Sequence, residues 1–458
     1  MKLYDAARKL KKAYKQQMKK QAGKYLSPVR RLERVAPPSG GRYAAMTFDD
    51  GPDAAPTNPR HSELGLTEDL LQTLSEYGAK GTFDVIGTTE ENYPDEAGPS
   101  GTFTWGGVTY DHYPDFAADK LGGAVNQPDL IEKILREGHE ISSHTYRHIL
   151  FGPNRLVYGK RKSYPGLPAV IDDLKQLHRL MEETYGYTIR MSRPPHYIDK
   201  TRDGYSAYDA YRYMNYQYMA ASFDGGGWQV SGDYRKDVDS MIAPLKAALE
   251  MNPESLNGQI IFQKDGCNMS KQTPIADALK PQLELLKQYG YQIITVSELT
   301  NLSPFEDTPD TDPVHPHAAA LLKAGHCIAH KNNTLQPDKP MNLGELLMML
   351  ASPEKLLSHY RAWVDSGFVL PEDHKIISGS WRLLPTHPYF HAFVMASDSG
   401  LILSGNPKNQ NWNTPLTHEM FAEILQEHTG SKSVRAKGAN KILTKRDILE
   451  PLAGALLS

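Results

Sequence analysis

The sequence lacks the features of a disulfide-stabilised, membrane-spanning or nucleic-acid-coating protein. Only two of its 458 residues are cysteine, Cys267 and Cys327, and they form no metal-binding pattern, so we expect free thiols. No apolar run approaches the roughly 18 residues of a transmembrane helix. The formal net charge is only -3, which excludes a general attraction to nucleic acid. What is left is a globular chain long enough for two or three domains.

The amino-terminal segment is strongly basic and has no secretory signal pattern, because it lacks both an apolar core of about 7–15 residues and a small-residue cleavage site. Its first 34 residues contain many lysines and arginines but only two acidic residues, Asp5 and Glu33. A loose apolar stripe runs through Leu3, Ala6, Leu10, Ala13 and Met18. Two interpretations stay open for this predicted leader helix, residues 1–36. It is a basic amphipathic helix for an anionic lipid, wall-polymer or nucleic-acid surface, or a solvated leader that packs lightly on its domain.

Residues 37–300 alternate between strand and helix patterns. Strands are predicted over 43–48, 82–86, 258–262 and 291–296, and helices over 67–77, 130–137, 171–185, 205–219 and 275–289. This alternation predicts an α/β layer or barrel. The stretch 87–127 is rich in Gly, Pro, Tyr, Asp and Thr, and its length is typical of a functional loop.

A linker and a second, smaller domain follow. Residues 301–316 are predicted as a linker because prolines stand among acidic residues, at Pro304, Pro309, Pro313 and Pro316. Residues 317–458 are mostly helical in pattern and contain a weak repeat. Gly325 precedes Pro340 by the same 15 positions that separate Gly400 from Pro415, and a third fragment begins at Leu443. We predict a separate, mostly α-helical domain here.

Two short motifs combine residues that bind metals. Thr47–Pro52 reads Thr-Phe-Asp-Asp-Gly-Pro, and His144–His148 reads His-Thr-Tyr-Arg-His. Asp49 and Asp50 follow one another at a strand end, so one carboxylate can bind a metal while the other stays unligated to act as a base. The two imidazoles, at i and i+4, meet on one helix face or across one tight turn. One carboxylate and two histidines leave a coordination position for water, as in a catalytic metal site.

At these motifs the sequence resembles the polysaccharide deacetylases, carbohydrate esterase family 4, over about residues 42–300. Thr47–Pro52 matches the first motif of the family. Further similar segments are Phe83–Gly87, Gly138–Thr145, Arg193–His196 and Ile294–Leu299. The resemblance implies a distorted (β/α) barrel, here with a smaller helical C-terminal domain, and an enzyme that removes acetyl groups from N-acetylated sugars.

The resemblance also implies a role for each matching residue. The implied ligands of a divalent metal, usually zinc, are Asp50, His144 and His148. Asp49 would be the base that deprotonates a metal-bound water. Arg193 would orient Asp49 and balance its charge, and a backbone N–H at His196 would help the metal to stabilise the oxyanion.

Two positions depart from the family pattern. Asp224 and Trp228 of the fourth motif are kept, but Gly227 stands before the tryptophan, where the family has aspartate. Lys264 occupies the position of the histidine that serves as general acid in the family. Asp224 lies where the family has a partner of that histidine. Histidine suits that role because its pKa of about 6.5 lies near neutrality, whereas the lysine pKa of about 10.4 must first be lowered. Three outcomes stay open: Lys264 donates the proton, His196 or another group does, or turnover is weak or absent.

The C-terminal repeats resemble degenerate S-layer homology modules, whose recurring pattern is Pro-Ile-Thr-Arg-Ala-Glu. The matching segments are Asn342–Glu345, Thr417–Met420 and Thr444–Asp447. Only the third keeps a basic residue beside threonine, Lys445. Two interpretations are weighed equally: a domain that binds charged cell-wall polymer, and a helical bundle for packing or oligomerisation.

We therefore predict one of two functions. The first is metal-dependent N-deacetylation of peptidoglycan or a chitin-like glycan. The second is a catalytically impaired protein that binds metal and glycan at the cell surface. Members of the family usually act outside the cell, yet no export signal is visible. A truncated start, a non-classical export route or a cytoplasmic, spore-related role would each reconcile the two observations.

Overall fold

The computed structural model describes residues 22–55, 63–89, 103–105, 108–110, 120–153, 162–228, 231–266, 272–402, 411–430 and 441–457. Most of the predicted leader, much of the predicted loop over 87–127 and Cys267 lie outside these residues. Cys327 is a buried free thiol, as expected. Among the described helices, none has the length and apolarity needed to cross a lipid bilayer.

The chain forms two compact units. The larger unit comprises the described residues between 32 and 303, and the smaller one joins the described residues from 304 onward to residues 22–31. The smaller unit therefore begins within the segment predicted as a linker, and Phe305 of that segment is buried in its hydrophobic core. The domain boundaries drawn from the sequence stay predictions.

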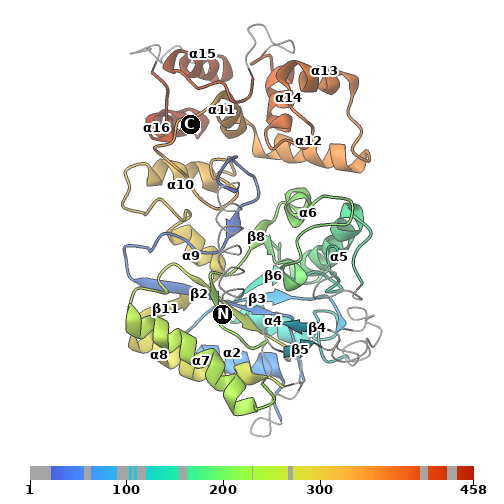
Figure 1. Ribbon diagram of the computed structural model, residues 1–458, viewed down its shortest axis with the longest axis vertical. Helices are drawn as coiled ribbons and strands as arrows, with labels where there is room; N and C mark the ends of the chain where they lie inside the picture. The colour runs from blue at the N-terminus through green and yellow to red at the C-terminus, as the bar shows by residue number, and fades with distance from the viewer. Residues whose placement is uncertain are drawn as a thin grey trace, which may run out of the picture. The chain divides into compact units, whose positions relative to one another are not determined.

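A parallel sheet forms the centre of the larger unit (Figure 1). Its strand order is β1-β8-β7-β6-β3-β2-β10-β9, and β11 pairs with the first half of β2. The described pairs from β8 to β9 along this order are all parallel. The strands are β1 (Arg31–Leu32), β2 (Arg42–Asp49), β3 (Gly81–Val85), β6 (Glu140–Ser143), β7 (Met191–Ser192), β8 (Gln217–Met219), β9 (Phe223–Asp224), β10 (Ile260–Lys264) and β11 (Tyr291–Ile294).

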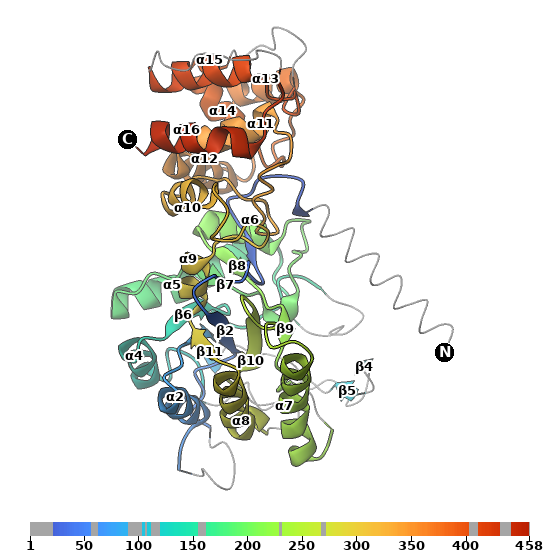
Figure 2. The same cartoon turned by 90° about the vertical axis from the view of Figure 1, so that its left-hand side faces the viewer.

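Helices connect these strands, as a (β/α) arrangement requires. Helices α7 and α8 pack against each other, and α8 also contacts α2 and β11 (Figure 2). A separate antiparallel pair is formed by β4 (Phe103–Trp105) and β5 (Val108–Tyr110). The helices are α2 (Leu66–Glu76), α4 (Pro128–Arg136), α5 (Leu167–Tyr185), the 3₁₀ helix η2 (Pro195–Tyr197), α6 (Ala207–Met214), α7 (Tyr234–Met251), α8 (Pro274–Gln288) and α9 (Val296–Leu302). The predicted distorted barrel is confirmed, and its described strands run from β1 to β9 without closing.

One predicted element is wrong in its second half. The tyrosine-rich segment 205–219, predicted as a single helix, is helix α6 followed by strand β8. Asn215 ends the helix in a left-handed conformation (φ 61°), which asparagine adopts more readily than most residues. Tyr211 and Tyr218 are fully buried, so these tyrosines belong to the core of the unit.

The central strand β2 is enclosed by neighbours and helices, and residues 44–48 are fully buried. Its nearly continuous apolar run is typical of a central parallel strand. The strand ends at Asp49, which is in register with Asp84 of β3 on one side and Lys264 of β10 on the other. The sheet thus brings three chargeable side chains to the edge where its parallel strands end, and this edge is where α/β sheets bind ligands.

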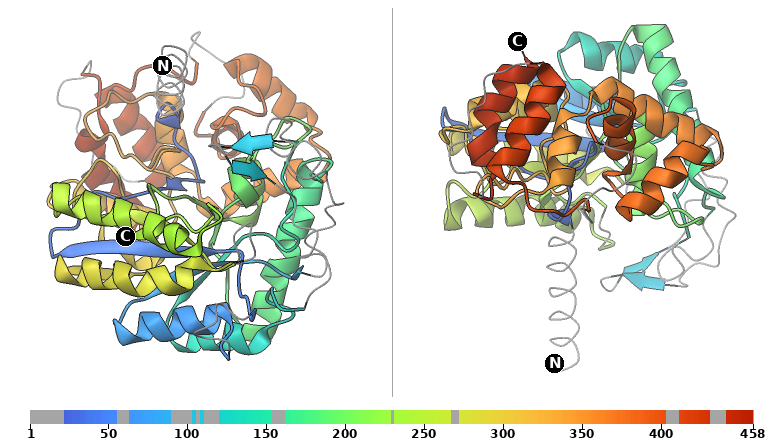
Figure 3. Two further views of the ribbon diagram at one scale, coloured as in Figure 1. Left: turned by 60° about the horizontal axis from the view of Figure 1, so that its bottom comes forward. Right: turned by 90° about the horizontal axis from the view of Figure 1, so that it is seen from above.

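The smaller unit is helical, as predicted, and Figure 3 (right) shows its helices in orange and red. They surround α11, whose residues are all buried. Residues 22–31 join this unit, where the ring of Tyr25 packs edge-on against Tyr389 and Trp412. The helices are α10 (His315–Lys323), α11 (Leu343–Leu350), α12 (Pro353–Asp365), α13 (Glu372–Trp381), α14 (Phe390–Asp398), α15 (His418–Thr429) and α16 (Lys445–Leu456).

The three repeat segments occupy equivalent positions in this unit. Each begins a helix, with Asn342, Thr417 and Thr444 as the N-cap residues of α11, α15 and α16. The segments also pair with one another, because single antiparallel bridges join Asn342 to Pro415 and Thr417 to Ile442. The weak sequence repeat therefore corresponds to three helix starts that meet in one core.

The helix caps predict a stability effect. The Asn342 side chain accepts a hydrogen bond from the N–H of Glu345 at 3.0 Å, so Asn342→Ala should destabilise the smaller unit by about 1 kcal/mol. Urea unfolding followed by circular dichroism measures this. Ser352→Ala is the matched control, because Ser352 is the N-cap residue of α12 but makes no capping hydrogen bond. Equal losses in the two variants would contradict the role given to Asn342.

Candidate metal centre

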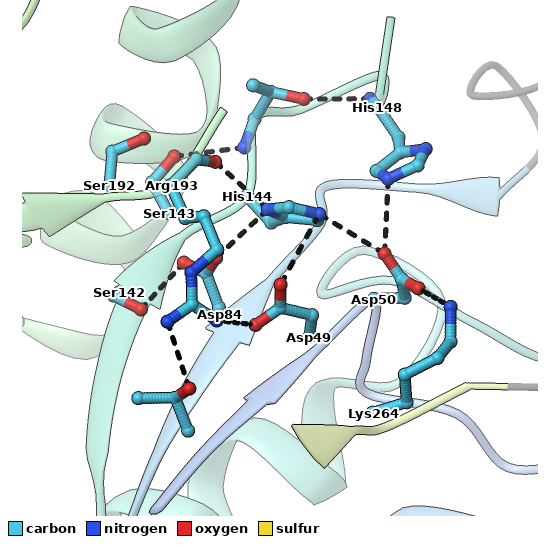
Figure 4. A network of polar contacts seen from close by, with 12 residues as sticks. Asp49, Asp50, Asp84, Ser142, Ser143, His144, His148, Ser192, Arg193 and Lys264 are labelled. Atoms are coloured by element: carbon cyan, nitrogen blue, oxygen red, sulfur yellow. Dashed lines mark hydrogen bonds and ion pairs between the residues drawn. The ribbon is translucent and has the colours of Figure 1, made fainter. Parts of the chain in front are cut away.

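Six of the residues singled out in the sequence meet where β2, β6, β7 and β10 end (Figure 4). They come from chain segments more than 200 positions apart. The parallel sheet brings them together because every one of them lies at, or just after, the carboxyl end of a strand. These residues are Asp49, Asp50, His144, His148, Arg193 and Lys264.

Asp50 and the two histidines have the spacing of a metal site. Oδ1 of Asp50 lies 3.2 Å from Nε2 of His144 and 3.1 Å from Nε2 of His148. Zinc ligands bind at about 2.0–2.1 Å, and a tetrahedral arrangement then separates them by roughly 3.3 Å. Both imidazoles are buried in the protein. These three residues could therefore hold a zinc-like ion with little movement.

The chain from Thr145 to His148 forms a turn, not a helix. Thr145 and His148 both have positive φ angles, 77° and 50°. The hydroxyl of Thr145 accepts a hydrogen bond from the N–H of His148 at 2.8 Å and so fixes the second imidazole. Of the two arrangements left open by the i, i+4 spacing, the structure adopts the tight turn.

The other nitrogen of His144 faces acceptors. Its Nδ1 lies 2.9 Å from Oδ2 of Asp84 and 2.9 Å from the carbonyl oxygen of Arg193. A proton held there leaves the lone pair on Nε2, which faces Asp50, free for a metal. Ser142 donates a hydrogen bond to the other oxygen of Asp84 at 2.7 Å and so orients it. Burial opposes a charge on His144, yet Asp84 and Asp49 outweigh it and raise the pKa of His144 to about 10. The same carboxylates attract a metal cation.

Asp49 is held apart from the three candidate ligands. Arg193 is fully buried and donates hydrogen bonds to Oδ1 of Asp49 and to the Thr47 hydroxyl. The second oxygen of Asp49 lies 4.0 Å from Nε2 of His144, which places it beside the candidate ion site. Burial raises the pKa of Asp49 to about 7, although Arg193 and His144 act in the opposite direction. Asp49 is thus a carboxylate suited to take up a proton near neutral pH.

Lys264 contacts the candidate ligand set directly. Its ammonium is paired with Oδ2 of Asp50, the oxygen that does not face the histidines. Burial favours a neutral Asp50, but Lys264 and the hydrogen bonds from both histidines outweigh it and hold the pKa of Asp50 well below its usual range. Lys264 therefore places a positive charge on a residue that a metal would use.

The last two predicted site residues lie at the margin. The ring of His196 packs edge-on against His148 at 5.2 Å, and His196 has a positive φ of 54°. Asp224 is exposed on β9, where it accepts hydrogen bonds from the Trp228 indole at 3.2 Å and from the Gly226 N–H at 2.9 Å. Its described contacts hold the 224–228 loop together.

Two residues of the site were not identified from the sequence. Asp84 resembles any polar residue of a strand, and only its register opposite Asp49 shows that it lies at the site. Asp265, directly after Lys264, is buried and accepts a hydrogen bond from Thr67 at 2.7 Å. A side chain at position 51 would collide with Asp265, which explains the glycine in the first motif.

The chain is similar to several known proteins. Residues 36–210 match the family model described as polysaccharide deacetylase. The chain is 26% identical over 264 residues to a peptidoglycan-N-acetylglucosamine deacetylase of Bacillus cereus, which covers 57% of this chain and 90% of the relative. It is 24% identical over 262 residues to the peptidoglycan-N-acetylmuramic acid deacetylase PdaC of Bacillus subtilis, which covers 56% of this chain and 38% of the relative.

Two solved structures are also similar to part of the chain. The structure of PdaC from Bacillus subtilis is 20% identical with a TM-score of 0.37, over 57% of this chain and 92% of that one. A CE4 family pseudoenzyme from Bacillus anthracis is 14% identical with a TM-score of 0.39, over 60% of this chain and 69% of that one.

The family match spans strands β2, β3 and β6 with Asp49, Asp84 and His144, and it includes Arg193, whereas Asp224 and Lys264 lie beyond it. The resemblance found in the sequence motifs is thereby confirmed, and residues 36–210 belong to the polysaccharide deacetylases, a family of hydrolases.

Proposed function

We propose that this protein is a zinc-dependent deacetylase of N-acetylated cell-wall glycan, with Asp50, His144 and His148 as the metal ligands. The main support is that one oxygen of Asp50 lies 3.2 Å and 3.1 Å from the two imidazole nitrogens. Asp49 lies beside them as a separate carboxylate, paired with Arg193. When bound, the ion would supply Lewis-acid activation of the acetamide carbonyl and of water.

The chain's own residues would handle the protons. Asp49 takes a proton from the attacking water at Oδ2, because its Oδ1 is engaged by Arg193. Arg193 keeps the carboxylate in place, and the backbone N–H at His196 is the proposed donor to the developing oxyanion. The C–N bond then breaks, and its nitrogen needs a proton to leave as an amine. The products are acetate and a free amino sugar.

Peptidoglycan is the proposed substrate, because two relatives are named as peptidoglycan deacetylases. A chitin-like glycan is the alternative, since a 110-residue segment is 30% identical to a chitooligosaccharide deacetylase of Bradyrhizobium. That match covers only 24% of this chain and 30% of the relative.

For the smaller unit we favour a packing role over binding of charged wall polymer. Lys445, the one basic residue kept beside threonine in the repeats, is 1% exposed and lies 3.0 Å from Nε2 of His330. Its ammonium also donates to the carbonyl oxygen of Leu335. Burial lowers the pKa of Lys445 to about 8, which is a further cost for a charge at this position. A buried lysine does not offer its charge to a polymer.

One observation favours the alternative, a catalytically impaired metal- and glycan-binding protein. The ammonium of Lys264 is paired with Asp50 and is thereby held at a proposed metal ligand. A proton donor for the leaving amine must instead reach the amide nitrogen. Lys264 can donate this proton only if the metal ion binds Asp50 in its place and so frees the ammonium group.

Asp84 should control metal affinity through His144. Asp84→Asn keeps the shape but removes the charge that orients the imidazole, so zinc affinity should fall by about 10–100-fold. Competition with a zinc-binding dye measures the change. His178→Ala is the control, because His178 pairs with Glu182 on helix α5 outside the site, and it should leave affinity unchanged. An Asp84→Asn protein with wild-type affinity would refute the role of Asp84.

Asp49 should be essential for turnover but not for metal binding. Asp49→Asn should lower acetate release from N-acetylglucosamine oligomers and peptidoglycan by about 10²–10⁴-fold, because the proton acceptor is lost. The zinc content of the variant should equal that of the wild type. Asp239→Asn, an exposed residue of α7 paired with Arg235, is the matched control. Unchanged acetate release from Asp49→Asn would show that the proposed mechanism is wrong.

Lys264 decides between the two proposals. If its ammonium is the proton donor, Lys264→Gln should lower acetate release by about 10²-fold or more, and Lys264→His should retain or exceed wild-type release because imidazole titrates near neutrality. Release by Lys264→His alone would identify the missing acid as the defect and support the impaired alternative. Wild-type release from Lys264→Gln would mean that Lys264 is not the donor.

A further inference from the structure

We propose that the smaller unit contains a second metal site, formed by His359, His374 and Asp398, which binds a zinc-like divalent cation and joins three helices. This site shares no residue with the candidate metal centre described above. It goes beyond the proposed deacetylase function and does not depend on it.

The three side chains come from three helices of one bundle, α12, α13 and α14 (Figure 1). Helix α14 packs against both α12 and α13. The ligand atoms of the two imidazoles and the carboxylate all lie within 4.8 Å of one another. The rings of His359 and His374 have centroids 6.1 Å apart and planes inclined by 33°. Tetrahedral zinc spaces its ligand atoms by roughly 3.3 Å, so the three donors would move closer together when an ion binds.

The position of Asp398 is unfavourable for an isolated carboxylate. Asp398 is the last residue of α14, and no basic residue occupies the last turn of that helix. The negative end of the helix macrodipole disfavours an anion at this position. A bound cation would offset this repulsion. A metal ion would therefore account for an acidic residue at the end of α14.

The two histidines have few opposing charges around them. His359 and His374 are both partly buried. Lys355, one turn earlier on α12, is the nearby cation that opposes a metal, but it is exposed and its charge is screened by water. Lys375, the neighbour of His374, is engaged by Glu372 at 2.8 Å.

The donor set indicates the class of metal. Two imidazoles and one carboxylate suit zinc and similar transition-metal ions, whereas magnesium and calcium prefer sites built from oxygen alone. The three residues are partly or fully exposed, and the ion would tie the C-terminal end of α14 to α12 and α13. A structural ion is therefore the expected role, and it would stabilise the smaller unit by binding the folded state.

The test uses the full chain with His144→Ala and His148→Ala, which removes the first site. After zinc loading and gel filtration, elemental analysis should find one zinc per chain. The melting temperature of this protein should rise with zinc but not with magnesium. Adding His374→Ala should remove the ion, and adding Asp398→Asn should weaken its binding by more than the roughly 10–100-fold cost of losing an outer-shell partner.

Two comparisons keep the result decisive. His317→Ala, a partly buried histidine of α10 outside the cluster, should retain the ion in the same background. His374→Gln replaces the imidazole conservatively, and unfolding in EDTA checks that each variant is folded. The proposal is overturned if the background protein retains no zinc, or if zinc remains bound with unchanged affinity after His374→Ala.

Discussion

The in-register alignment of parallel strands is the constraint on which the catalytic unit depends. Asp49 lies opposite Asp84 on one side and Lys264 on the other because β2 pairs with β3 and β10 at fixed positions. A slip of one residue would turn every side chain of a strand to the opposite face. The apolar run of β2 prevents such a slip, since its residues must stay buried. Burial of the core thereby sets the distances between charged groups at the strand ends.

Those charges set how strongly the site attracts a cation. Three carboxylates, Asp49, Asp50 and Asp84, face the cations Arg193 and Lys264 and the imidazole of His144, whose pKa they raise to about 10. A neutral histidine at position 264, as in the family pattern, would remove one positive charge from this cluster. The lysine thus stabilises Asp50 when no ion neutralises it, and it competes with an ion for the same carboxylate. Under the proposed function, this single substitution changes both the supply of protons and the affinity for metal.

The sequence was sufficient to single out Asp50, His144 and His148 as candidate ligands, since they lie in two recognisable motifs, and the structure brings the three side chains together. It was insufficient for Asp84, because a lone carboxylate in a strand has no local signal and acquires its role from strand pairing. The pairing of Lys264 with Asp50 depends on the same long-range register. The prediction of one helix over 205–219 is wrong beyond Met214 for a local reason, because Asn215 adopts a left-handed conformation and ends the helix.

The two candidate metal sites contain the same donors, two histidines and one aspartate, in different surroundings. The first is buried, has a carboxylate behind one imidazole, and has Asp49 and Arg193 beside it. The second is partly exposed, with His359 in the middle of α12, His374 in the first turn of α13 and Asp398 at the end of α14. The same donors can therefore suit different functions. Catalysis needs a positioned base and a desolvated site, whereas stabilisation needs only ligands on separate helices. In this chain the proposed catalytic site differs from the proposed structural one by the sheet edge that surrounds it.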